Sequence, residues 1–487
     1  MRDLLADLLQ QATRGGATAA DAFVVEDRSF SAQVRLGQVD IVKHAREQHM
    51  ALRVFVGKSV AAASTSDLSR ESVARLVEEA VSLARVTSPD EMGGLPEAAE
   101  LARQVPDLDL RDPRGHDLSP EEKIELARRC EAAALEADPR ITNSEGGDFS
   151  DRRARYAYAT SHGFSGEYET SSFSLAVAPV AAENGEMQRD SWYHVARKRA
   201  RLEAPEEIGR TAARRAVRRL GARRVKTAEV PVIFDPDMAA TLVRHIAGAA
   251  AGPALYRRAS FLVGKLGERI AAPSVTIVDD GTLAGALGSR PFDGEGLPVR
   301  RTVVVDQGIL RSYLLDTYSG RKLGLPSTHH AARDGSGVSV STTNLHLAAG
   351  DRSPADLIRS VKNGLYVTEL IGFGVNGVTG DYSRGAVGLW IENGELTYPV
   401  EEITIAGNLL DMYFAVEGVG NDLVLRDRTA APTLLVGRMT VAGSCGSASR
   451  HDHRQPLPPA RPGLRGRPRH RRPGHRAQRV GGGGGRM

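Results

Sequence analysis

The sequence predicts an α+β protein, in which N-terminal α/β units of the form helix–strands–helix precede a large, β-rich and barrel-like C-terminal domain. Two patterns favour this class. Helical and alternating apolar patterns succeed one another twice before Gly221, and valine-rich runs with many glycines take over from Val230. The 487 residues also exceed the size at which one hydrophobic core stops growing. We therefore expect domains at 1–105, 106–226 and 227–443, followed by a tail at 444–487.

The first unit begins with an amphipathic helix, because the leucines within residues 4–9 share one helical face. A second helical pattern starts at about Ser69, and prolines between 89 and 113 mark a loose connector. Between the two helices, apolar residues alternate with polar ones and predict strands at 22–25, 32–36 and 51–56.

The second unit opens with a strong helix start at Ser119-Pro120-Glu121-Glu122, where a serine N-cap, a first-turn proline and a capping-box glutamate coincide. A closing helix is expected over 205–220, ended by Gly221. Between them we expect strands at 153–160 and 168–180, followed by a hairpin turn at Glu183-Asn184-Gly185-Glu186.

The third unit is mostly β. Hairpin turns are expected at Asp306-Gln307-Gly308 and Glu392-Asn393-Gly394-Glu395, and helices at Asp235-Pro236 and Ser353-Pro354, where a capping residue precedes a first-turn proline. Valine- and isoleucine-rich runs predict strands at 232–234, 275–278, 302–305 and 389–391.

Charge is divided unevenly along the chain. From Ser444 onward there are eleven arginines and one acid, so the tail carries +10; since the whole chain carries +4, the remainder carries −6. We therefore expect no nucleic-acid binding by the folded body, and a disordered tail. The pairs Arg214-Arg215 and Arg218-Arg219 are interpreted as a solvated helix face, because no aromatic residues interleave with them.

The composition also bears on the compartment. Cys130 and Cys445 are the two cysteines of the sequence, which excludes a disulfide framework or a cysteine-rich zinc site. No run approaches the roughly 18 apolar residues of a membrane span. The first residues read as an acidic amphipathic helix instead of a basic, then apolar, signal sequence. We expect a cytoplasmic protein with no membrane partner.

Several stretches of the sequence together resemble the TldD/PmbA family, and specifically its PmbA (TldE) branch. The resemblance covers about residues 20–443. No single short motif carries it. The most specific stretches are 256–262, Val278-Asp279-Asp280-Gly281-Thr282, 374–383, 390–409 and the ending Met439-Thr440-Val441-Ala442-Gly443.

In the TldD branch, the family pattern has a helix with His-Glu-x-x-x-His, two zinc ligands and a glutamate base, and a cysteine near the C-terminus as third ligand. On the matching helix, Arg244 takes the first histidine position, His245 the glutamate position and Ala249 the second histidine position. The stretch matching the cysteine region, Glu417-Gly418-Val419-Gly420-Asn421, has none. We expect no catalytic residue and no metal site in this chain, and a hydrogen-bonded structural role for His245.

Three weaker candidates remain. His329-His330 with Asp334 could bind a metal, although adjacent residues seldom point at one ion. The spacing Gly372-x-Gly374-x-x-Gly377 matches a dinucleotide fingerprint in letters only, because no βαβ unit surrounds it. A polar cluster in a glycine-rich segment is interpreted as a tight turn with Asp381 and Ser383 satisfying backbone amides; if it is functional, it contacts a peptide or a partner. With a later asparagine, its residues are Thr379, Asp381, Tyr382, Ser383 and Asn408.

The resemblance implies a subunit that pairs with a TldD-type zinc protease, the zinc lying in the partner. Together the two chains would cut unfolded or short peptides, including peptide-antibiotic precursors and antitoxins. This chain would help to enclose the cleft and offer strand edges to the peptide. Two alternatives stay open: an autonomous metallopeptidase using His245, His329 or His330, and a non-enzymatic binding or regulatory module, in line with the family's association with DNA gyrase.

Overall fold

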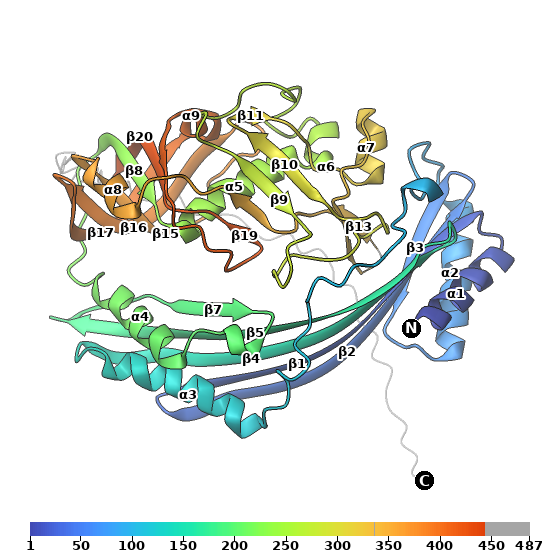
Figure 1. Ribbon diagram of the computed structural model, residues 1–487, viewed down its shortest axis with the longest axis horizontal. Coiled ribbons are helices and arrows are strands. Elements are labelled where there is room, and N and C mark those ends of the chain that lie inside the picture. Colours follow the sequence, from blue (N-terminus) through green and yellow to red (C-terminus); the bar gives the residue numbers. More distant parts are fainter. Residues whose placement is uncertain (336, 444–487) are drawn as a thin grey trace, which may run out of the picture. The chain divides into compact units, whose positions relative to one another are not determined.

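The computed structural model describes residues 1–335 and 337–443, so the predicted tail at 444–487 lies outside the described residues. The N-terminal half forms one antiparallel sheet with the strand order β3-β2-β1-β4-β5-β6, and β7 also pairs with β5 (Figure 1). The strands are β1 (Ala19–Arg35), β2 (Gln38–Val56), β3 (Ser59–Thr65), β4 (Ile141–Thr160), β5 (Ser165–Glu183), β6 (Glu186–Arg189) and β7 (Trp192–Ala196).

The central strands are longer than the sequence predicted. The runs at 22–25 and 32–36 are parts of one strand, β1, which has 17 residues. Polar residues between them interrupt the apolar alternation, but the backbone of β1 stays paired with β2 on one edge and with β4 on the other. Because ladder hydrogen bonds join backbone groups, the strand continues through the polar residues. Asp27 in this stretch pairs with Arg152 of β4.

Four helices pack on this sheet. Helices α1 (Arg2–Arg14) and α2 (Arg70–Val86) share a core with β1 to β3, while α3 (Pro120–Glu136) and α4 (Pro205–Val217) pack against β4 and β5. Figure 1 shows the two pairs near opposite ends of the long strands. The predicted capping box of α3 is confirmed, since Ser119 Oγ accepts from the Glu122 amide and Glu122 accepts from the Ser119 amide. Short 3₁₀ turns lie at Ala98–Glu100 and Arg199–Arg201.

Three predicted hairpin turns have the left-handed backbone that their sequences favour. The φ angles are +53° and +87° at Asn184 and Gly185, +47° and +80° at Gln307 and Gly308, and +52° and +83° at Asn393 and Gly394. Positive φ at both central residues is the type I′ turn, which matches the twist of the flanking strands. These turns set the register of the hairpins β5–β6, β10–β11 and β16–β17.

The C-terminal half contains a closed barrel. Strands β8, β15, β16 and β17 pair in succession with β20 on the other side of β8, and β17 pairs again with β20, which closes the ring. This arrangement confirms the α+β class with a barrel-like C-terminal domain. The strands of this sheet are β8 (Ala228–Phe234), β15 (Asn363–Ile371), β16 (Asp381–Glu392), β17 (Glu395–Asn408), β18 (Val416–Val419) and β20 (Leu434–Ala442).

A second sheet with the order β11-β10-β9-β14-β19 completes the domain, and helix α5 (Pro236–Ala250) packs against β14, β15 and β19. Leu242, Val243 and Ile246 of α5 are buried in the core that both sheets share. The remaining elements are β9 (Ile277–Asp280), β10 (Arg301–Asp306), β11 (Ile309–Leu310), β12 (Ala331–Asp334), β13 (Gly337–Val340), β14 (Leu345–Leu347), β19 (Thr429–Ala430), α6 (Gly252–Tyr256), α7 (Thr317–Leu323), α8 (Pro354–Arg359) and α9 (Leu409–Phe414).

The ranges 1–105 and 106–226, which the sequence suggested as separate units, contribute strands to one sheet. Strand β1 pairs with β4 continuously from Asp21 to Val34. The two halves therefore share a continuous hydrogen-bonded ladder. No helix in the described ranges combines the length and apolar character needed to cross a lipid bilayer.

Candidate functional site

Helix α5 carries the three positions that match the family's metal-binding pattern. Asp235 caps the helix by accepting from the Met238 amide at 2.9 Å, as the sequence predicted. Arg244 is exposed on the outer face of the helix, His245 is half-buried, and Ala249 is buried in the core. The three positions therefore face different surroundings.

His245 does not make the hydrogen bond that the sequence led us to expect. Its Nε2 is buried without a partner among the described residues, and its ring meets that of Tyr382 edge-on at 6.2 Å. Burial lowers the pKa of His245, and the nearby Arg384 and Arg244 lower it further, so the imidazole is neutral at pH 7. The physical reason is that the helix turns this side chain toward an aromatic ring of the barrel instead of a carbonyl.

The residues at these positions do not fit a zinc ion. A guanidinium cannot deprotonate to become a ligand, and alanine has no donor atom. Val416 and Val419 of β18, beside the stretch 417–421, share the core of α5, but this stretch supplies no cysteine. Among the residues described, no group of three or more His, Cys, Asp or Glu side chains could hold a metal ion.

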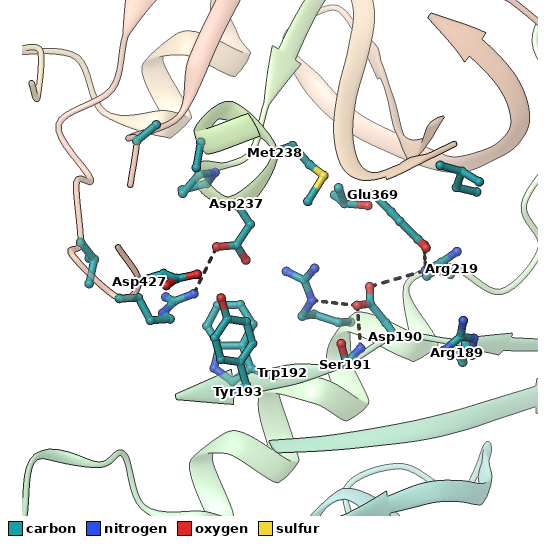
Figure 2. Close-up of a pocket in the computed structure, with 18 of the residues that line it drawn as sticks. Arg189, Asp190, Ser191, Trp192, Tyr193, Arg219, Asp237, Met238, Glu369 and Asp427 are labelled. Atoms are coloured by element: carbon teal, nitrogen blue, oxygen red, sulfur yellow. Dashed lines mark hydrogen bonds and ion pairs between the residues drawn. The ribbon is translucent and has the colours of Figure 1, made fainter. Parts of the chain in front are cut away.

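Arg244 opens onto a cleft of about 880 Å³. Figure 2 shows that β6, β7 and the segment between them line one side, and that α5 and the end of β15 line the other. The consecutive residues 187–193 all contribute to the wall, with 422–431 closing a further side. The helix that would carry the metal ligands in the TldD branch thus borders a cleft long enough for an extended chain.

Several charged side chains of this cleft are paired with one another. Asp190 accepts from Arg215 Nε at 3.1 Å, and its other oxygen lies 3.9 Å from Arg219 Nη1. Arg219 Nη1 also pairs with Glu369 at 2.6 Å. These arginines are not the solvated helix face that the sequence suggested: the side chains of Arg215 and Arg219 are 15% and 12% exposed. Their partners come from a hairpin and a strand far away in the sequence, which no local pattern reveals.

Trp192 of β7 lies between two of the cleft's arginines. The guanidinium of Arg426 is 4.1 Å from its ring centroid and that of Arg215 is 5.2 Å from it. Arg426 also lies 3.7 Å from Asp237 on α5. Such cation–π contacts hold the indole in place at the cleft wall. Trp192 and Asp190 were not among the residues predicted from the sequence, although a tryptophan next to a hairpin in a chain with two tryptophans was the available signal.

The glycine-rich segment before β16 brings together part of the predicted polar cluster. Thr379 Oγ1 donates to Asp381 at 2.6 Å, and Asn408 Nδ2 donates to the Thr379 carbonyl at 3.0 Å and to Asp381 at 3.4 Å. Gly380, with a φ of +83°, forms the tight turn expected there. The side chains that accept from backbone amides here are those of Asn376, from Val378 and Thr379, and of Thr379, from Asp381, and not those of Asp381 and Ser383.

The other two residues of the cluster lie apart from it. Ser383 is exposed on β16, and its amide donates to the Gly374 carbonyl at 2.6 Å. Tyr382 points into the core beside His245 and is 1% exposed, so its side chain is not at the surface. After Gly377 the chain runs into β16 and not into a helix, so this segment lacks the helix N-terminus that a dinucleotide fingerprint needs.

His329 and His330 point to different partners. His329 Nδ1 lies 2.7 Å from the Pro298 carbonyl oxygen. His330 is buried, with Nε2 at 3.1 Å from Asp279 and Nδ1 at 2.9 Å from Thr328 Oγ1. The two rings are therefore held by separate hydrogen bonds, as expected for adjacent residues of an extended segment.

The fold defines a class of protein: an α+β protein whose C-terminal domain, a closed barrel with a second sheet, matches a metallopeptidase domain. Three domain families match the chain in order. They are described as PmbA/TldA metallopeptidase domain 1 at 20–84, the central domain at 113–220, and the C-terminal domain at 227–443. The chain belongs to the PmbA/TldA metallopeptidase family.

Full-length relatives agree with this assignment. The chain is 41% identical over 429 residues to Metalloprotease PmbA of Escherichia coli O157:H7, covering 88% of this chain and 93% of that one. It is 36% identical to the Metalloprotease PmbA homolog of Haemophilus influenzae, covering 91% and 96%. The Metalloprotease TldD homolog of the same organism is more distant, at 28% identity over 61% of this chain and 64% of that one.

The fold is similar to that of a solved relative. The crystal structure of a candidate modulator of DNA gyrase from Bacteroides thetaiotaomicron superposes with a TM-score of 0.84 at 29% identity, covering 91% of this chain and 98% of that one. The resemblance read from the sequence is confirmed over the same domains.

Proposed function

We propose that this chain is the non-catalytic, PmbA/TldE-type subunit of a heterodimeric, cytoplasmic protease whose zinc site lies in a TldD-type partner. The observation that carries the proposal is the position of Arg244. It places a permanent positive charge on the cleft wall, at the position that matches the first zinc-binding histidine of the TldD branch. The cleft is retained while the groups that would do the chemistry are not.

The cleft can hold an extended peptide. Residues 187–193 run along its wall, and among the described residues the strands β6 and β7 within this stretch pair only with β5. Each therefore keeps one edge without a neighbouring strand. A peptide that aligns there gains backbone hydrogen bonds that do not depend on its sequence, which suits unfolded or short substrates such as peptide-antibiotic precursors and antitoxins. Most strands of a folded protein are already paired within its own sheets.

Two exposed apolar surfaces fit a partner subunit. Strand β3 pairs with β2 over residues 50–56 only, so within the described chain the β2 edge before residue 50 has no strand beside it. Leu36, Val39, Ile41 and Val42 are exposed on this hairpin. A long, apolar, unpaired edge is an aggregation hazard in a monomer. A partner chain that covers it removes the hazard.

The second surface is the segment between β15 and β16. Phe373 is fully exposed, and Ile371 and Val378 are exposed beside it. Ile371 also lines the cleft, so this surface borders the site at which a peptide would lie. Haemophilus influenzae has both a PmbA homolog and a TldD homolog, which is the combination that a heterodimer needs.

The proposal is tested by mixing the full chain with the TldD-type protein of the same organism and following cleavage of an unfolded peptide by mass spectrometry. Each chain alone should leave the peptide intact and the mixture should cut it. Phe373→Ser should weaken pairing at least about tenfold, while Val86→Ser, which changes another exposed apolar side chain at the end of α2, should leave it unchanged. Cleavage by this chain alone would overturn the proposal.

A further inference from the structure

A second, smaller cavity of about 200 Å³ lies between the sheet and the loop that contains residues 287–294. Aromatic rings form much of its wall. Tyr156 and Tyr168 stack with ring centroids 5.0 Å apart, and Phe292 meets Tyr168 edge-on at 5.3 Å. Burial, together with the neighbouring Tyr156, raises the pKa of Tyr168 to about 12, so the phenol stays neutral. We call this cavity the aromatic recess.

Three of the arginines that line the aromatic recess have no carboxylate partner among the described side chains. Arg197, Arg290 and Arg428 all line it, and none of the three forms an ion pair with a side chain that the structure describes. Arg197 is held by the carbonyl oxygens of Ser171 at 3.1 Å and Leu287 at 2.6 Å. Burial, together with the neighbouring Arg428, lowers its pKa to about 10, which still leaves it charged at neutral pH.

A fourth arginine of the aromatic recess, Arg333, has a nitrogen without a hydrogen-bond acceptor in the described part of the chain. The Arg333 side chain is 2% exposed and lines the recess, yet its Nη1 has no hydrogen-bond partner among the described residues. Arg290 Nε is likewise buried without a partner. Buried donors of a charged group are costly when left unsatisfied. The recess thus holds unsatisfied, preorganised positive charge.

The acids nearby neutralise only part of this charge. Asp21 accepts from Arg333 Nη2 at 2.6 Å and also from Arg53, so one carboxylate is shared between two guanidiniums. Asp293, the one acid of the recess wall, has its pKa raised to about 7, first by burial and then by Glu295. Three arginines therefore face a wall whose single carboxyl group is about half-protonated at neutral pH.

We propose that the aromatic recess binds the C-terminal carboxylate of a peptide whose last residue has an aromatic or large apolar side chain. Guanidinium groups bind carboxylates through two parallel hydrogen bonds, and the tyrosine and phenylalanine rings offer the surface on which such a side chain packs. The volume is below the roughly 300–1,000 Å³ typical of drug-sized ligands, which suits a single terminal residue. The peptide character of the ligand rests on the proposed function.

The surroundings of the recess leave room for a peptide whose C-terminal residue is bound in it. A larger cavity of about 1,040 Å³ adjoins it, because Phe23, Arg152, Tyr156 and Arg333 line both. One loop also separates the recess from the cleft, since Arg428 faces the recess while Asp427 and Thr429 line the cleft. The rest of a peptide therefore has room beside the recess.

The test is isothermal titration calorimetry of the full chain with N-acetyl-phenylalanine, its C-terminal amide, the tetrapeptide acetyl-Ala-Ala-Ala-Phe and inorganic phosphate. The two free acids should bind saturably, and the amide and phosphate at least about tenfold more weakly. Arg428→Gln and Arg290→Gln should each weaken binding of the tetrapeptide about tenfold or more. Arg301→Gln, which changes another exposed arginine without an ion pair, should have no effect. Thermal unfolding of each variant verifies that it is folded.

Equal binding of acid and amide, or unchanged binding by the Arg428 and Arg290 variants, would overturn the carboxylate site. Phosphate binding as tight as that of the acids would overturn its chemical class, and binding of N-acetyl-phenylalanine without the tetrapeptide would overturn the peptide assignment. The result is separable from the proposed function, because the titration needs no partner. Pairing and cleavage without tetrapeptide binding would remove this inference alone, and binding without pairing would remove the proposed function alone.

Discussion

Four of the five arginines that line the cleft beside α5 pair with carboxylates, whereas three of the arginines that line the aromatic recess pair with none of the described side chains. In the cleft, Arg215, Arg219 and Arg426 each pair with a carboxylate, and two of them also flank Trp192. In the recess, Arg197 and Arg290 have no such partner among the described side chains. Paired charges hold elements together, whereas buried unpaired charges carry a desolvation cost that a ligand can relieve. The paired arginines therefore stabilise the walls of the cleft, and the unpaired arginines leave the recess able to bind an anion.

The largest effect should come from the acid that lies behind the recess. Asp21 is fully buried and pairs with Arg53 and Arg333. Asp21→Ala removes the carboxylate that both guanidiniums share. It should lower the free energy of unfolding, measured by urea denaturation at pH 7, by about 3–5 kcal/mol. A loss under about 1 kcal/mol would show that Arg53 and Arg333 can stay buried without the Asp21 carboxylate. The contrast between paired and unpaired arginines would then have no energetic meaning.

The same acid makes a pH prediction. Burial alone would raise the pKa of Asp21, but Arg333 and Arg53 outweigh it and hold the pKa below its ordinary value. A lowered folded-state pKa stabilises the protein above about pH 4, and this contribution disappears as the pH falls through the folded-state pKa. The wild type should therefore lose more stability between pH 5 and pH 3 than Asp21→Ala, in urea titrations at each pH.

A smaller loss is expected in the cleft. The Asp190 side chain is 9% exposed. Its removal leaves the Arg215 guanidinium with one more distant carboxylate, that of Asp235 at 3.9 Å. Asp190→Ala should cost about 2–3 kcal/mol, below the range for a fully buried pair because water reaches the cleft. Glu402→Ala removes the exposed pair with Arg224 and should cost no more than about 1 kcal/mol. Equal losses of stability for the two variants would mean that the ion pairs of the cleft stabilise the protein no more than an exposed pair does.

The smallest effect concerns the one acid of the recess wall. Asp293 has a pKa of about 7, raised by burial and Glu295 and lowered in part by Arg290. Arg290→Gln should raise the pKa of Asp293 further, which carbon NMR titration of the carboxyl group detects. The folded state then prefers the protonated acid, so this group's contribution to stability falls as the pH rises through 7. An unchanged pKa would place Arg290 outside the electrostatic reach of the recess.

Local patterns predicted the elements that local chemistry determines. The caps at Ser119, Asp235 and Ser353 and the turns at Asn184 and Asn393 follow from residues within four positions of one another. The length of β1 was missed because its polar middle is held by two neighbouring strands, one of them more than 100 residues away. Sheet pairing over that distance leaves no short-range signal.

The residues of the candidate site were likewise only partly predictable from the sequence. The family match located α5, and with it Arg244, His245 and Ala249, from the sequence alone. It could not show that His245 faces Tyr382, or that Tyr382 is buried while Thr379, Asp381 and Asn408 form one cluster. Nor could it show that Arg215 of α4 and Arg219 just after it meet Asp190 and Glu369, because these contacts depend on how the sheet and the barrel pack.

The most direct test of the central claim, that the zinc chemistry lies in another chain, is the zinc content of the full-length protein purified alone and with its TldD-type partner, measured by inductively coupled plasma mass spectrometry. The account predicts well under one zinc per chain alone, and about one zinc per heterodimer, with no change on His245→Ala. Stoichiometric zinc in this chain alone that is lost on His245→Ala would contradict it.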